Sequence, residues 1–125
     1  MRDIKFRGKT INGEWVYGNL VQGNDDTGCC IIDYANHETD TYSWNEVHPD
    51  SVGEYTGLKD HNGKEIYEGD ICESIGCRFK VGFKNGAFSA EYSEKSEDCF
   101  YLGNANESRF EIIGNIYQNP ELLHK

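Results

Sequence analysis

The chain has 125 residues, with 22 acidic against 12 basic side chains, a formal charge of −10, 14 glycines and two prolines. This length predicts one domain. The charge excludes a non-specific nucleic-acid binder or a protein attracted to anionic membranes, because both need cationic surfaces. An acidic surface is expected to keep the protein dispersed, but it also leaves open a decoy that imitates nucleic acid toward a host DNA-binding protein.

The first residues, "MRDIKFRGK", contain no apolar segment of the kind found in secretory signals, and no apolar run approaches a membrane span. We therefore expect a cytoplasmic protein whose five cysteines are free thiols.

Short strands separated by turns are predicted along the first half. "DIKFR" alternates Ile4 and Phe6 on one face, "GEWVYGNLV" follows the turn dipeptide Asn12-Gly13, and "GCCIIDY" is a third apolar run. "SWNE", at residues 43–46, has the spacing of a capping box. We therefore expect a single helical turn there, ended by His48-Pro49.

The second half contains stronger turn signals. Asn62-Gly63 lies between "GEYTGL" and "KEIY", and Asn85-Gly86 lies between "RFKVGF" and "AFSAEY", so each pair predicts a hairpin. "EGD" forms another turn into the strand "ICES". "RFEIIGNIY" is predicted to be a closing strand with a bulge or close approach at Gly114. Asn119 and Pro120 predict the start of a short C-terminal helix.

These elements predict an all-β fold in a single domain. Residues 52–117 are expected to form a small barrel, residues 1–50 a second β-layer, and residues 118–125 a tail. Most aromatic residues of the second half should lie in the core, although a small barrel has few inward positions and some should be exposed. These residues are Tyr55, Tyr67, Phe79, Phe83, Phe88, Tyr92, Phe100, Tyr101 and Tyr117.

The stretch "GLKDHNGKEIYEGD", residues 57–70, superficially resembles a phosphate-binding loop. Five residues separate Gly57 from Gly63 where a P-loop has four, and Lys64 precedes Glu65 instead of Ser or Thr. A carboxylate cannot replace that hydroxyl beside phosphate. The stretch is therefore interpreted as hairpin turns, with positive φ at Gly63 and Gly69.

A calcium-binding loop is also a poor match to this stretch. Counting from Asp60, Asn62 suits the third position of an EF-hand, but Lys64 occupies the fifth, where an oxygen ligand is needed. An irregular oxygen site built from Asp60, Glu68 and Asp70 stays open. Turn carboxylates are ordinarily solvated, so we expect no metal here.

The thiols do not form a metal motif. Cys72 and Cys77 have no second matched pair, and adjacent Cys29 and Cys30 point to opposite faces if they lie on a strand. No nucleophile elbow or other local catalytic signature occurs. We therefore expect no cofactor, no structural metal and no enzymatic activity. The histidines lack paired spacing; they are His37, His48, His61 and His124.

The surface positions selected as a candidate ligand- or partner-binding site are Asp60, Asn62, Tyr67 and Asp70. They lie on or beside adjoining turns, where side chains are commonly free to meet a partner. A structural alternative stays open for each: Asp60 and Asp70 would cap turn amides, and Tyr67 would pack.

Four blocks in order along the chain resemble the YopX family of small phage and prophage proteins: "IKFRGK", "GEWVYGNLV", "HPDSVGEYTGLKDHNGKEIYEGDI" and "FEIIGNIYQNPELL". The resemblance implies an all-β fold of coiled, bent sheets with an SH3-like barrel in the C-terminal part, a tendency to homo-oligomerise, and action inside a bacterial host cell. It brings no catalytic or binding residue with it.

The leading hypothesis is a non-enzymatic binding or assembly protein whose partner is another copy of itself or a host or phage protein. A first alternative is sequestration of a small nucleotide or other signalling ligand at a subunit interface. The second is the acidic decoy. Phosphate would need cations, and the loops offer Lys59, Lys64, Arg78, Lys80, Lys84 and Arg109.

Overall fold

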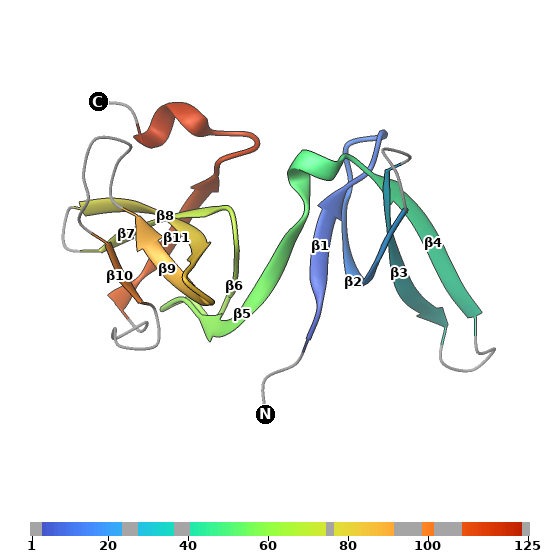
Figure 1. Ribbon diagram of the computed structural model, residues 1–125, viewed down its shortest axis with the longest axis horizontal. Helices are drawn as coiled ribbons and strands as arrows, with labels where there is room; N and C mark the ends of the chain where they lie inside the picture. Colours follow the sequence, from blue (N-terminus) through green and yellow to red (C-terminus); the bar gives the residue numbers. More distant parts are fainter. Residues whose placement is uncertain are drawn as a thin grey trace. The chain divides into compact units, whose positions relative to one another are not determined.

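The protein is all-β, as predicted, and divides into two compact units, Met1–Tyr55 (unit 1) and Thr56–Lys125 (unit 2) (Figure 1). A computed structural model describes residues 4–23, 28–36, 41–74, 77–91, 99–101 and 109–123. Every strand pairing recorded there is antiparallel. Among these residues, the helical elements with defined ends are two short 3-10 turns, at Pro49–Ser51 and Pro120–Leu123. None of the described helices is long and apolar enough to cross a membrane.

Unit 1 is a bent sheet in which neighbouring strands follow the order β4-β3-β2-β1-β5. At its far end, Thr10 bridges to Val47 and the N–H of His48 donates to the Lys9 carbonyl, so the end of β1 meets the end of β4. The sheet is therefore rolled. Its elements are β1 (Phe6–Lys9), β2 (Trp15–Gln22), β3 (Cys29–Asn36), β4 (Thr41–Val47), the 3-10 turn η1 (Pro49–Ser51) and the start of β5 (Gly53–Lys59).

The inner side of this roll is packed closely. Directly opposed residues of antiparallel strands share a face, and the register places Ile31 beside Leu20 while Val47 pairs with Cys29. Ile31 and Val47 are both buried. A Cβ on Gly8 would come within 2.7 Å of Val47 Cγ2, so only glycine lets the strands approach this closely.

The helical turn expected at residues 43–46 is wrong. These residues belong to β4, where Trp44 pairs with Ile32 and Ser43 with Asp33. The backbone groups are satisfied by the neighbouring strand, and this long-range pairing outweighs a local capping motif that no apolar helical repeat follows. A helical turn does occur just after it, at Pro49–Ser51, with proline at its start.

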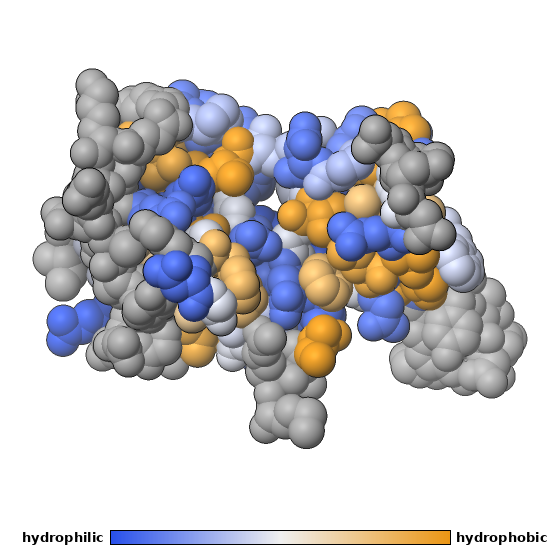
Figure 2. All heavy atoms as spheres, viewed as in Figure 1, coloured by the Kyte–Doolittle hydropathy of each residue, from blue (hydrophilic) through white to orange (hydrophobic). Residues whose placement is uncertain are grey.

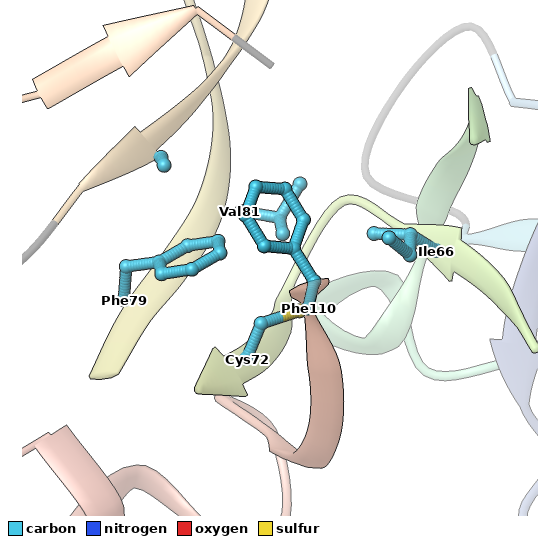
Figure 3. Packing of buried hydrophobic residues seen from close by; sticks show 6 residues of the cluster. Ile66, Cys72, Phe79, Val81 and Phe110 are labelled. Atoms are coloured by element: carbon cyan, nitrogen blue, oxygen red, sulfur yellow. The ribbon is translucent and has the colours of Figure 1, made fainter. Parts of the chain in front are cut away.

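Unit 2 is built on a sheet of order β10-β9-β8-β7-β11, while β6 pairs with the later part of β5. Phe79 and Phe110 meet edge to face, with ring centroids 5.0 Å apart, at the centre of a buried cluster (Figure 3). The cluster also holds Ile66, Cys72, Val81 and Ala90. The elements are β6 (Glu65–Tyr67), β7 (Asp70–Ser74), β8 (Cys77–Lys84), β9 (Ala87–Glu91), β10 (Cys99–Tyr101), β11 (Glu111–Asn115) and η4 (Pro120–Leu123).

The turn signals of unit 2 are confirmed. Asn85 and Gly86 both have positive φ between β8 and β9, which suits a two-residue hairpin turn. Gly63 and Gly69 also have the predicted positive φ. The register between β7 and β11 shifts just before Gly114, as the bulge prediction required.

The predicted C-terminal helix is the 3-10 turn η4. Asn119 precedes it, accepting a bond from the Leu122 N–H, and Leu122 packs so close to Gly114 that a Cβ there would lie 2.9 Å from its Cδ1. The predicted boundary near residue 50 and the barrel class of unit 2 stay predictions.

Candidate functional site

Asp60 holds together the loop between β5 and β6 and ties it to a distant strand. Its Oδ1 accepts the N–H groups of Asn62 and Lys64, each at 2.9 Å, and its Oδ2 accepts the N–H of Ile112 at 3.1 Å. Its own N–H donates to the Lys64 carbonyl. With only 5% of its surface exposed, Asp60 acts as a turn cap and as a link to β11.

The environment of Asp60 favours the ionised carboxylate. Burial raises the pKa of Asp60, but the three backbone N–H groups, with a smaller electrostatic contribution from His61, outweigh burial, so this pKa lies below its ordinary value. Asp60 is therefore charged at neutral pH, with both oxygens already engaged by the backbone.

Asp70 and Tyr67 form a second, smaller turn contact. The Tyr67 N–H donates to Asp70 Oδ2 at 2.7 Å, and the Tyr67 hydroxyl donates to Glu65 Oε1 at 3.1 Å. Asp70 is 1% and Tyr67 2% exposed. Both side chains therefore contribute to the interior of unit 2.

The expectation that the four selected side chains are free to meet a partner is wrong for Asp60, Tyr67 and Asp70, which are buried, whereas Asn62 is exposed. The physical reason is that these turns pack beneath other strands, so their carboxylates satisfy backbone amides in place of water. In the described part of the chain, no group of three or more His, Cys, Asp or Glu side chains is arranged to hold a metal ion.

Two of the six cations considered for phosphate binding have carboxylate partners. Arg78 Nε lies 3.1 Å from Glu73 Oε2 and its Nη1 donates to the Leu122 carbonyl, while Lys80 Nζ lies 3.1 Å from Glu91 Oε2. These contacts brace the sheet and its C-terminal turn. The side chains of Lys59, Lys64 and Arg109 are exposed, and that of Lys84 lies outside the described residues.

The described thiols differ in exposure. Cys72 is buried in the unit 2 cluster and Cys77 is exposed, while Cys29 and Cys30 occupy successive positions of β3 and so point to opposite faces. The side chain of Cys99 lies outside the described residues.

A surface not selected from the sequence lies on the outer side of unit 1. The register aligns Ile32 with Trp44 and Val21 with Cys30, opposite to the buried side of the roll. Trp44 is 66%, Tyr17 45% and Val21 40% exposed. We call this the outer face, with Trp15, Tyr17, Val21, Ile32 and Trp44 as its apolar members. Apolar residues are visible at the surface over β1–β4 in Figure 2.

Cations line one margin of the outer face. Lys5, Arg7 and Lys9 alternate along the chain and share one side; Arg7 lies 4.9 Å and Lys9 5.9 Å from the Trp15 ring centroid. Glu46 is the acidic member. These four charges sum to +2 in a chain of net −10, so the outer face is a non-acidic region of an acidic protein.

Sequence reasoning missed this surface because Trp44 was placed in a helical turn. The available signal was the run "TYSWNEV", in which aromatic residues alternate with polar ones as in a half-exposed strand.

A model of the family described as YopX protein matches residues 5–124. The chain belongs to the YopX family. The crystal structure of protein EF1440 from Enterococcus faecalis resembles this YopX chain with a TM-score of 0.55 and 24% sequence identity, over 99% of this chain and 100% of that one. This likeness supports the all-β fold. Among curated proteins, none matches the chain.

Proposed function

We propose that this YopX-family protein is a non-enzymatic, homo-oligomeric protein-binding or assembly module. The observation that carries the proposal is the outer face of unit 1, where Trp44, Tyr17 and Val21 expose large apolar side chains on neighbouring strands. Trp, Tyr and Arg are the residues most enriched in the energetic centres of protein interfaces. Adjoining exposed apolar side chains are also a recognised mark of interaction sites.

The turn carboxylates support a structural role over a catalytic one. Both oxygens of Asp60 accept backbone bonds, and Asp70 is buried beneath the Tyr67 amide that it caps. A general acid or base must reach a substrate proton, which these groups do not offer in this arrangement.

Two finer features belong to the same proposal. The five-stranded antiparallel sheet of unit 2 and its buried Phe79–Phe110 cluster support an SH3-like barrel. The family resemblance supports a phage or prophage origin and action in the cytoplasm of the bacterial host, where a host or phage protein would be a further partner.

The test is the oligomeric state of the purified protein, measured by sedimentation velocity and light scattering over about a hundredfold range of concentration. We expect a concentration-dependent oligomer. A strict monomer throughout this range contradicts self-assembly. A thermal shift caused by a nucleotide would favour ligand capture, and a host partner released by rising salt would favour the acidic decoy.

A further inference from the structure

Strand β4 is an open edge of the unit 1 sheet. It is the outermost strand in the order β4-β3-β2-β1-β5-β6. On the side of β4 away from β3, only its last residue, Val47, forms a bridge within the described residues. Its register with β3 is unbroken from Val47 to Tyr42. Proteins usually protect such edges with lysine, proline or a bulge, yet "TYSWNEV" contains neither residue.

We propose that β4 pairs antiparallel with β4 of a second copy, about a two-fold axis at Trp44, so that one sheet runs through both copies. This inference rests on the proposed self-assembly and names its interface. When two strands are related by a two-fold axis, the residue on the axis lies directly opposite the same residue of the other copy. Such a pair can be hydrogen-bonded or non-hydrogen-bonded, so the backbone of Trp44 allows this register. Strand addition at an exposed edge is a common mode of protein association.

The charges of β4 select this register. Glu46 is its single charged residue. With the axis at Trp44, Glu46 faces position 42 and Ser43 faces Asn45, so no like charges are opposed. An axis at Glu46 would place two carboxylates opposite each other, which is destabilising.

The same register buries the exposed tryptophan. Opposed residues have Cβ atoms about 4.5–5.5 Å apart, so the two Trp44 side chains would cover each other. Because Trp44 pairs with Ile32 inside each copy, the outer faces of the two copies would form one continuous surface. The local charge also suits a second copy, because the charges of the outer face sum to +2 and it carries none of the net −10 that makes two chains repel. Added salt should screen that repulsion and strengthen the dimer.

The experiment measures dimer affinity for the full chain, for Trp44→Lys and for Ile4→Lys. Trp44→Lys places two ammonium groups on the axis and should weaken the dimer at least about a hundredfold. Ile4 is the matched control, because it is 66% exposed, as Trp44 is, but precedes β1 and belongs neither to the outer face nor to β4. Ile4→Lys should change the affinity less than about threefold.

Hydrogen exchange on the unmodified protein gives a readout that does not depend on how a variant folds. Within residues 41–45, the alternate amides that point away from β3 should become protected as concentration rises. Monomers at all concentrations would overturn the proposed self-assembly and the inference with it. An oligomer that leaves these amides unprotected, or that tolerates Trp44→Lys, would overturn the β4 interface alone. Equal losses from both variants would mean that the effect of Trp44→Lys is not specific to β4, and would also overturn the edge register.

Discussion

Asp60→Ala is expected to be among the most destabilising single changes in the turns of unit 2. The substitution removes an acceptor from three backbone N–H groups. Those of Asn62 and Lys64 lie in an exposed loop where water can replace the bond, so each loss costs roughly 1 kcal/mol. The Ile112 N–H is half-buried and loses a bond to a charged group, about 1.5–3 kcal/mol.

The expected total is therefore about 3–5 kcal/mol, a large part of the stability of a small domain. Urea unfolding at pH 7, followed by far-ultraviolet circular dichroism, measures it directly. Asp60→Asn, which keeps one acceptor oxygen but no charge, should lose about half as much. Asp50→Ala provides the matched control, because Asp50 is an exposed turn carboxylate, and should stay within about 0.5 kcal/mol.

A loss below about 1 kcal/mol for Asp60→Ala would refute this reasoning. It would mean that water satisfies the Ile112 amide without the carboxylate, and that β11 is held in place by its pairing with β7 alone.

Three further changes follow from the same structure. Because the folded-state pKa of Asp60 is lowered, its contribution should be complete above the unfolded-state pKa of about 3.9 and fall as pH decreases through the folded value; urea titrations from pH 7 to 3 should show the gap to Asp60→Asn narrowing below about pH 4. Gly18→Ala should prevent normal folding of unit 1, because its Cβ would overlap the Ile32 carbonyl. The Cβ of Gly63→Ala meets no atom, so this change should cost only about 1 kcal/mol for the positive φ. Thermal unfolding measures both variants. Phe79→Ala should destabilise unit 2 by about 3–5 kcal/mol in chemical denaturation, and a loss under 1 kcal/mol would contradict its central place in the cluster.

Features set by neighbouring residues were predictable. The hairpin at Asn85-Gly86 and the turn at Asn62-Gly63 depend on the conformations that Asn and Gly adopt easily. The close approach at Gly114 depends on the small size of glycine, because a Cβ there would lie 2.7 Å from Asn119 Oδ1. Strand β4 was mistaken for a turn because its pairing with β3 lies outside the local window that suggested a capping box. Strand β10 has only three residues, Cys99–Tyr101, too few to show an alternating pattern.

The candidate site also has features that were predictable from neighbouring residues and features that depend on distant strands. That Asp60 and Asp70 cap nearby amides was a stated alternative, since aspartate in turns commonly does so. Their burial depends on strands that arrive much later in the chain, as the Ile112 bond to Asp60 illustrates. The exposure of Trp44 follows from which side of a rolled sheet it occupies, and only the strand register decides that.

The bond from Ile112 to Asp60 joins groups 52 positions apart, which has a consequence for biosynthesis. When the ribosome has released the hairpins up to β9, the Asp60 carboxylate still lacks its third donor, and Phe110 has yet to fill the cluster beside Phe79. Contacts of such separation form late because closing the intervening chain is entropically unfavourable. Nascent chains stalled before residue 110 should therefore be sensitive to proteases, and completion of the final strand should end that vulnerability.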